Sequence, residues 1–346
     1  MKYNYFALFL FITHIMNAQL TDVIFGLNAH GLALNGNDLY IADAAGNKIS
    51  KIDITDSPPS LIDVVTGLNV PYGLALDGNE LYIAESGGNK ISKINITHTS
   101  PTTTDVISGL KNPTRLLINN NDLFISEYQG NKVSKIDITH SSPSLIDVVT
   151  GLTSPVGIAL IGNELYIAES GGGKISKINI THTSPTTTDV ITNLNAPFGL
   201  ILNNNILFIT EFNGDNISKI DTTDPSPSPI DVVTGLNRPS DILISNNDLF
   251  ISESFGNKVS KLTNGTLSIE ERILKHNVQL YPNPSSEFII VKGLTRAENY
   301  KIYNILGMEV LNGIAFNGEK IQIKQLPNEL YFLKFNNGKS LRFVKN

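Results

Sequence analysis

The chain has 346 residues, of which 41% are hydrophobic and 17% charged, so it can bury the core of one large or two ordinary domains. It contains no cysteine, which excludes disulfides, thiolate chemistry and cysteine-based zinc sites. The net charge of −6 combines an acidic part, with 14 Lys/Arg and 27 Asp/Glu in residues 19–271, and a basic part, with 11 Lys/Arg and 5 Asp/Glu in residues 272–346. An acidic body does not favour a nucleic-acid partner, and we expect none.

The first residues, MKYNYFALFLFITHIMNAQL, have the parts of a secretory signal peptide. Lys2 supplies the positive start, Tyr5 to Met16 an apolar core, and Ala18 a small residue at the cleavage point. The apolar run is too short to cross a membrane as a helix, and we see no later segment that could. We therefore expect residues 1–18 to be a signal peptide and the chain to be exported.

The next part of the chain is an internal repeat. A segment of the form Asp-Val-Val/Ile recurs at Asp22, Asp63, Asp105, Asp147, Asp189 and Asp231. The spacing is 41 residues once and 42 residues thereafter. Each unit holds four strand-like pieces, which are DVVTGL, GLAL, ELYIAE and KISKINI in the second unit. Four short antiparallel strands in about 42 residues make one blade of a β-propeller.

The amino-acid sequence of the units resembles a known repeat. PYGLALDGNELYIAESGGNKISKI is similar to the NHL-type repeat, with its Pro-x-Gly opening, its Tyr-Ile-Ala-acid strand end and its Gly-Asn-basic turn. The resemblance covers about Asp22 to Leu262 and occurs six times. It implies the six-bladed β-propeller of the NHL and gluconolactonase-like proteins, in residues 19–262, and it implies no single activity.

Two further features agree with six blades. Each Asp-Val-Val segment is expected to be the outer strand of the preceding blade, so Asp22 to Phe25 should complete the last blade and close the ring. The 26 residues Leu81–Val106 recur at Leu165–Val190, 84 residues later, with Gly173 in place of Asn89. A copied pair of blades explains that distance and gives three pairs.

The period stops after Leu262, and a second domain follows. We expect a linker over residues 263–274 and a small β-sandwich over 275–346. Tyr281-Pro-Asn-Pro, Ile-Tyr-Asn-x-x-Gly at 302–307 and Leu-Pro-x-x-x-Tyr-Phe at 326–332 together resemble the type A sorting domain of the type IX secretion system. The resemblance implies secretion machinery as a partner, and a secreted protein or one on the outer surface of a Gram-negative bacterium. An unrelated immunoglobulin-like module is the alternative.

Two sets of residues look like ligand sets. The histidines of the THTSP and THSSP turns are His98, His140 and His182. These turns lie at the outer ends of blades, too far apart to share a zinc ion, so we assign them to turns. The second set is the acid that ends the third piece of each unit, namely Asp43, Glu85, Glu127, Glu169, Glu211 and Glu253. These carboxylates could form a ring that binds a cation, but we favour the interpretation that each one holds its local turn or pairs with a lysine.

The positions where the blades differ gather on one face. The first residues of the inner strands are His30, Tyr72, Thr114, Val156, Phe198 and Ser240. The next residue is glycine in four blades but Arg115 and Asp241 in the third and sixth, which are opposite each other. We hypothesise that these two charges meet across the channel, against the alternative of two independent solvated side chains. In the turn after the second strand, Tyr128, Phe212 and Phe255 replace small residues.

The candidate binding residues are therefore those that break the repeat on this face: His30, Tyr72, Arg115, Tyr128, Phe198, Phe212, Asp241 and Phe255. The aromatic side chains could stack on a sugar or hold a peptide, and the alternative role is packing between blades.

Three functions remain open. We favour a non-catalytic binding propeller with a glycan or protein ligand and no cofactor. The second is a metal-dependent lactonase or hydrolase, for which Ca²⁺ bound at Asp241 would be support. The third is an adhesin or scaffold without a small ligand. No residue pair suits nucleophilic catalysis, and no phosphate-binding loop is present.

Overall fold

The computed structural model describes residues 19–263, 279–294, 297–335 and 340–346. The expected signal peptide at 1–18 lies outside these ranges, as does the expected linker after Thr263. The chain divides between Thr266 and Leu267 into two compact units, and the described residues of both contain strands and no helix.

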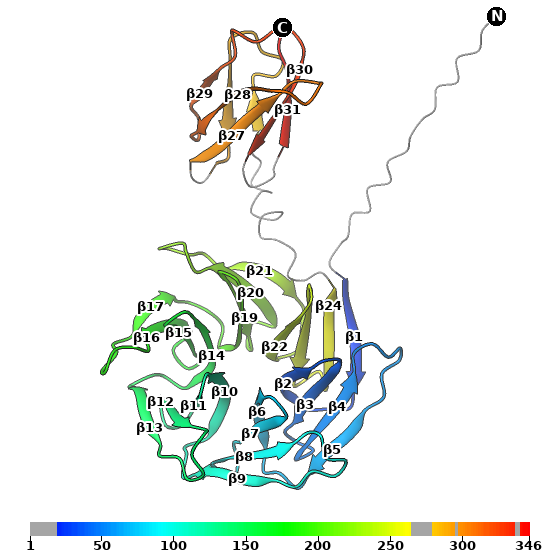
Figure 1. Cartoon of the computed structure of the whole chain (residues 1–346), viewed down its shortest axis with the longest axis vertical. Helices are drawn as coiled ribbons and strands as arrows, with labels where there is room; N and C mark the ends of the chain where they lie inside the picture. The colour runs from blue at the N-terminus through cyan, green and yellow to red at the C-terminus, as the bar shows by residue number, and fades with distance from the viewer. Residues whose placement is uncertain (1–18, 264–278, 295–296, 336–339) are drawn as a thin grey trace, which may run out of the picture. The chain divides into compact units, whose positions relative to one another are not determined.

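The first unit is a six-bladed β-propeller, as predicted (Figure 1). Each blade is a four-stranded antiparallel sheet, and β2, β6, β10, β14, β18 and β22 surround the centre. Blade 1 contains β2 (Ala29–Asn35), β3 (Asp38–Asp43), β4 (Lys48–Asp53) and β5 (Ile62–Thr66). Blade 2 contains β6 (Pro71–Asp77), β7 (Glu80–Glu85), β8 (Lys90–Asn95) and β9 (Thr104–Ser108). Blade 3 contains β10 (Pro113–Asn119), β11 (Asp122–Glu127), β12 (Lys132–Asp137) and β13 (Ile146–Thr150).

The remaining blades repeat this order. Blade 4 contains β14 (Pro155–Ile161), β15 (Glu164–Glu169), β16 (Lys174–Asn179) and β17 (Thr188–Ile191). Blade 5 contains β18 (Pro197–Asn203), β19 (Ile206–Glu211), β20 (Asn216–Asp221) and β21 (Ile230–Thr234). Blade 6 contains β22 (Pro239–Ser245), β23 (Asp248–Glu253), β24 (Lys258–Thr263) and, as its outer strand, β1 (Gln19–Phe25).

The N-terminal strand closes the ring, as predicted. β1 runs antiparallel to β24, with Gln19 opposite Thr263 and Phe25 opposite Lys258. Both long sides of β24 are therefore paired, because β23 lies on its other side. The last blade thus gains its fourth strand from the other end of the propeller sequence.

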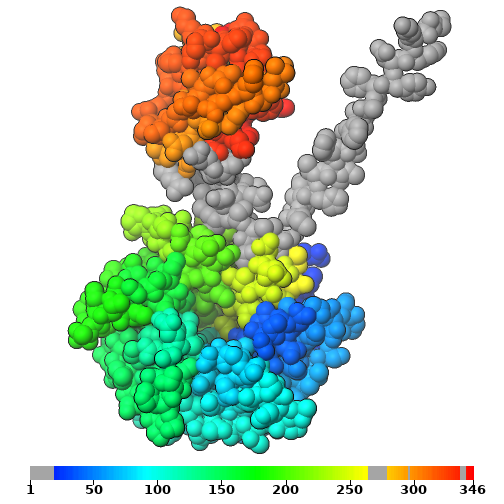
Figure 2. Space-filling view, in the orientation of Figure 1, coloured from blue at the N-terminus to red at the C-terminus, as the bar shows by residue number. Residues whose placement is uncertain are grey.

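Blades pack on one another through apolar side chains, and Figure 2 shows them side by side around the ring. Each of the six junctions between neighbouring blades holds its own cluster of buried residues. At the junction of blades 1 and 2, for example, Tyr40 and Ile49 of blade 1 pack with Leu81 and Ile94 of blade 2. The repeated Leu-Tyr/Phe-Ile of the second strand supplies side chains to both faces of its sheet, which explains why these positions hardly vary.

The second unit is a small β-sandwich, and its described strands form two sheets. One contains β25 (Gln279–Tyr281), β26 (Phe288–Lys292) and β29 (Lys320–Gln322). The other has the order β28 (Glu309–Ala315), β27 (Glu298–Tyr303), β30 (Leu330–Phe335) and β31 (Ser340–Val344). A single core, with Ile289 from the first sheet and Ile302 and Leu333 from the second, lies between them.

Candidate functional site

The candidate site lies on the face that carries the turns before the inner strands and the turns after the second strands. We call it the variable face. Backbone hydrogen bonds join the two kinds of turn within a blade: Ser86 N–H donates to Val70 O at 3.0 Å, and Tyr128 N–H donates to Asn112 O at 3.0 Å. Side chains from both turns can therefore reach one ligand.

Arg115 and Asp241 meet in the centre of the propeller, as hypothesised. Arg115 Nη2 lies 3.3 Å from Asp241 Oδ1, and Nη2 also donates to the carbonyl oxygen of Ser240. Both side chains are buried, at 7% and 12% exposure, so the alternative of two solvated groups is wrong. Asp241 Oδ2 also accepts from the backbone N–H of Leu32 at 2.8 Å. Burial raises the pKa of Asp241 above its ordinary value, while Arg115 and the backbone donors oppose that rise.

The glycines beside these charges show why only two blades carry them. A Cβ at Gly31 would overlap the carbonyl oxygen of Tyr72 in the next blade, and a Cβ at Gly157 would overlap that of Phe198. Blades 3 and 6 have a larger residue at this position and a serine hydroxyl at the junction with the next blade. Ser126 Oγ accepts from Arg115 N–H at 3.0 Å and donates to Val156 O at 2.5 Å.

The same arrangement recurs in blade 6, where Ser252 Oγ accepts from Asp241 N–H at 2.8 Å and donates to His30 O at 2.7 Å. The sequence signal for both is the segment DLFISE, which is identical at 122–127 and 248–253. This 126-residue distance gives the channel a pseudo-twofold order, which differs from the 84-residue order of the outer turns. Our sequence reading missed it.

His30 stacks on Tyr72 in the neighbouring blade, with ring centroids 3.9 Å apart. Burial, aided by the positive charge of Arg115, lowers the pKa of His30 to about 3, so the imidazole is neutral at physiological pH. Its Nδ1 is buried and has no hydrogen-bond partner among the described residues, and the same holds for Nε and Nη1 of Arg115. The centre of the channel is therefore polar but incompletely paired.

Three phenylalanines form a continuous group over blades 5 and 6. Phe198 stacks on Phe212 at 4.8 Å, and Phe212 meets Phe255 edge to face at 6.2 Å. Burial decreases outward along the group, from Phe198 at 8% exposure to Phe255 at 62%. At the inner end, the Arg115 guanidinium lies 5.9 Å from the centre of the Phe198 ring. The group links the ion pair in the channel to the surface.

Arg238 completes this group and was missed by the sequence reading. Its guanidinium lies 5.1 Å from the ring centre of Phe212 and 5.0 Å from that of Phe255, within cation–π distance of both. The signal was available, because Arg238 precedes the inner-strand proline at a position that is Val70, Asn112, Ser154 or Ala196 in other blades. We call Arg238, Phe198, Phe212 and Phe255 the arginine–phenylalanine cluster.

Tyr128 lies apart from this cluster. Its side chain is 36% exposed on the turn of blade 3, and it stacks with no other aromatic ring of the described residues. Of the eight predicted residues, the structure brings His30 to Tyr72, Arg115 to Asp241, and Phe198 to Phe212 and Phe255.

The six second-strand acids hold local structure, as we favoured. Glu85 shows the pattern: Oε2 accepts from Asn69 N–H at 2.8 Å, and Oε1 accepts from Ser92 Oγ at 2.6 Å and lies 3.5 Å from Lys90 Nζ. The three turn histidines are exposed, and His140 Nδ1 lies 3.2 Å from Asp137 Oδ2. No group of three or more His, Asp or Glu in the described part of the chain is arranged to hold a metal ion.

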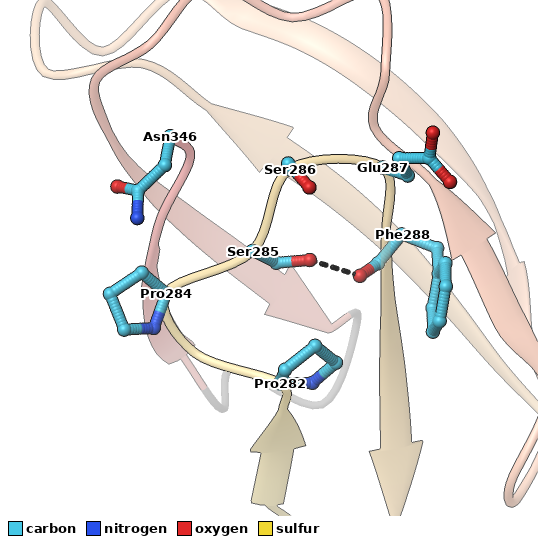
Figure 3. Close-up of a pocket in the computed structure, with 7 residues that line it drawn as sticks. All are labelled: Pro282, Pro284, Ser285, Ser286, Glu287, Phe288 and Asn346. Atoms are coloured by element: carbon cyan, nitrogen blue, oxygen red, sulfur yellow. Dashed lines mark hydrogen bonds between the residues drawn. The ribbon is translucent and has the colours of Figure 1, made fainter.

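A pocket of about 290 Å³ lies in the second unit, where the Tyr-Pro-Asn-Pro motif meets the last residue of the chain (Figure 3). Ser285 N–H donates to Val344 O at 2.9 Å, and Asn346 N–H donates to Ser285 O at 3.0 Å. Asn283 ties the same segments together, since its Oδ1 accepts from Val344 N–H and its Nδ2 donates to Arg342 O. The motif therefore anchors the C-terminal strand.

Residues 279–346 match the family model described as a secretion system C-terminal sorting domain. The second unit is this sorting domain. Such a domain marks a protein for the type IX secretion system, so the chain is exported to the cell surface or the extracellular space. Among the described residues, no helix has the length and apolar character needed to cross a membrane.

Comparison with solved structures finds other β-propellers that share the fold of this chain at low sequence identity. A putative gluconolactonase gives a TM-score of 0.61 at 11% identity, over 71% of this chain and 92% of that one. A catalytically inactive virginiamycin B lyase from Staphylococcus aureus, determined with quinupristin, gives 0.53 at 21% identity, over 68% and 80%. PorZ, a surface component of the type IX secretion system of Porphyromonas gingivalis, gives 0.51 at 13% identity, over 92% and 51%. No curated protein matches the sequence.

Proposed function

We propose that the exported propeller is a non-catalytic binding module whose ligand contacts the variable face over blades 5 and 6. The observation that carries this is the arginine–phenylalanine cluster, in which an exposed ring, a second ring and a cation are held together. Blades 1, 2 and 4 have only Ala, Ser or Gly at the turn positions of the two rings. Exposed aromatic rings supply large contact area at little cost in side-chain entropy. The proposal includes a cleaved signal peptide and repeats of the NHL type.

The roles of the candidate residues follow from their burial. Phe255 and Tyr128 are exposed and Phe212 and Tyr72 are half-buried, so these four can touch a ligand. His30, Arg115, Phe198 and Asp241 are buried and support the site from beneath.

The test is a glycan array probed with the full chain, followed by titration of each hit. We expect Phe212→Ala and Phe255→Ala to weaken binding at least tenfold, because each removes an aromatic contact surface, and Tyr128→Ala to weaken it less. Ile146→Ala is the matched control, since Ile146 is equally apolar and 54% exposed but lies on an outer strand. Equal binding by the phenylalanine variants and the control would reject the site.

A metal-dependent lactonase is the competing proposal, and Asp241 is the residue that distinguishes it. Here the carboxylate already binds Arg115 and Leu32, which argues against a role as a calcium ligand. Calorimetric titration with Ca²⁺ is therefore expected to show no binding that depends on Asp241. Binding that is lost in Asp241→Ala would favour the enzyme instead. An adhesin without a small ligand would show neither glycan nor calcium binding.

A further inference from the structure

Arg238 is the cation that lies against the aromatic rings of the variable face, and it has no anionic partner among the described residues. Its Nη1 donates to Asn213 Oδ1 at 2.9 Å, and no carboxylate of the described residues lies within ion-pair distance of the guanidinium. Several lysines elsewhere in the described propeller are paired with carboxylates: Lys48, for example, lies 2.8 Å from Asp63. The nearby Asp215 uses Oδ1 to accept from the backbone N–H of Arg238 at 2.9 Å.

We propose that Arg238 binds a ligand carboxylate, and that the ligand is an acidic glycan whose sugar ring packs on Phe255. This inference rests on the proposed function and specifies the chemistry of the same site. The propeller around it is strongly acidic, so an unpaired cation there selects for anions against the background charge.

The cluster holds the guanidinium ready for a planar anion. Arg238 lies near two rings that meet edge to face, and contact with both restricts its side chain before any ligand arrives. A guanidinium presents its N–H groups in a rigid fork that matches the two oxygens of a carboxylate. The backbone conformation is not special to Arg238, since Val70, Ser154 and Ala196 share its positive φ; the difference lies in the side chain.

A second cation lies at the base of the cluster. Arg115 is buried, faces Phe198, and has two N–H groups, on Nε and Nη1, without partners among the described residues. Only its Nη2 reaches Asp241 and Ser240. Two N–H donors of Arg115 beneath the rings are therefore unsatisfied, although Asp241 balances the charge of the guanidinium.

A sugar is favoured over a peptide because the contact surface is an exposed aromatic face. Phe255 is 62% exposed, and the apolar C–H face of a pyranose ring can lie flat on such a ring. A uronic acid unites that face and a carboxylate in one residue. An acidic peptide would supply the carboxylate but no comparable flat apolar surface.

The experiment compares trigalacturonate with its fully methyl-esterified form, which keeps the sugar and removes the charge, by calorimetry on the full chain. We expect the free acid to bind at least tenfold more tightly than the ester, and its affinity to fall with added salt. Arg238→Gln should weaken binding of the free acid at least tenfold and leave binding of the ester unchanged. Lys111→Gln, a loss of charge in the corresponding turn of blade 3, should leave both unchanged.

The outcomes separate this inference from the proposed function. If the ester binds as well as the acid through Phe255, or if Arg238→Gln binds the acid normally, the inference is wrong and the binding function stands. If hexaglutamate binds and trigalacturonate does not, the ligand is an acidic peptide and the glycan is rejected. If neither an array glycan nor hexaglutamate binds, both are rejected. An unchanged melting temperature for Arg238→Gln assigns its effect to binding.

Discussion

At the residue scale, the centre of the propeller is an exception to its own repeat. Two glycines followed by a charged residue occur once as Gly31, Gly73 and Arg115, and again as Gly157, Gly199 and Asp241. Glycine allows adjacent inner strands to touch, and a charged residue appears only where serine fills the junction. Removing one partner of such a buried pair leaves an uncompensated charge, which typically costs about 3–5 kcal/mol.

Stability should fall in mild acid because of His30. Its pKa is lowered from 6.5 to about 3 in the folded state. Below pH 6.5, His30 is therefore protonated in the unfolded chain but stays neutral in the folded one. Linkage then predicts a loss of about 2 kcal/mol between pH 7 and pH 5. His30→Phe retains a ring against Tyr72 but has no group that titrates in this range. We expect its free energy of unfolding, measured with urea at pH 7 and pH 5, not to show this loss.

Two comparisons check that interpretation. His98→Phe removes an exposed histidine from an outer turn, and the pH dependence of its unfolding should equal that of the unmodified protein. Asp241 acts in the opposite sense, since a raised pKa stabilises the fold at low pH and this contribution is lost as pH rises. If His30→Phe and the unmodified protein lose the same stability from pH 7 to pH 5, the neutral buried imidazole is excluded.

At the scale of elements, the blade boundaries were predictable from the sequence because each strand and turn repeats every 42 residues. The closing strand was predictable as well, since six outer strands need six segments and the first one precedes blade 1. The ion pair was predictable because Arg115 and Asp241 replace glycine at the same position of two opposite blades. The arginine–phenylalanine cluster was only partly predictable. The rings were seen, but their contact with Arg238 depends on side-chain directions across separate turns, since Phe212 and Phe255 lie 26 and 17 residues from Arg238.

Closure by β1 should control the stability of the whole ring. Ile24 packs against the core between blades 6 and 1, so Ile24→Asp would bury a charge there and cost about 2 kcal/mol or more. Phe25→Asp is the matched control, because Phe25 lies next to it but is 61% exposed, and it should change stability by less than about 0.5 kcal/mol. The measurement is the urea midpoint of the propeller transition. Equal midpoints for the two variants would show that β1 does not contribute to the core.

At the scale of the molecule, the propeller and the sorting domain have separate cores. None of the seven clusters of buried residues in the described chain contains residues from both units. The resemblance to sorting domains rested on three motifs, and the structure shows what one of them does. Tyr-Pro-Asn-Pro fixes the C-terminal strand through Asn283, and the next residue, Ser285, bonds to the same strand. The sequence motif alone could not reveal that partner, because it lies about 60 residues away.

We expect the two units to unfold independently. A chain of residues 19–263 should melt at the same temperature as the propeller transition of the intact protein, because it retains β1, β24 and all six inter-blade cores. Differential scanning calorimetry of the two proteins checks this. A shift of the propeller transition on removal of residues 264–346 would reveal stabilising contacts between the units and contradict the prediction.

The pairing of β24 on both sides has a mechanical consequence. β24 is the strand through which the chain leaves the propeller toward the sorting domain, and it is held between β23 and β1. A pulling force applied at Thr263 therefore acts on a strand that is hydrogen-bonded to two neighbours, and both sets of hydrogen bonds must break before it detaches. A strand at the edge of a sheet would have to break its bonds to one neighbour only. If the sorting domain tethers the protein to a surface, a load on the tether is shared by the two ends of the propeller sequence.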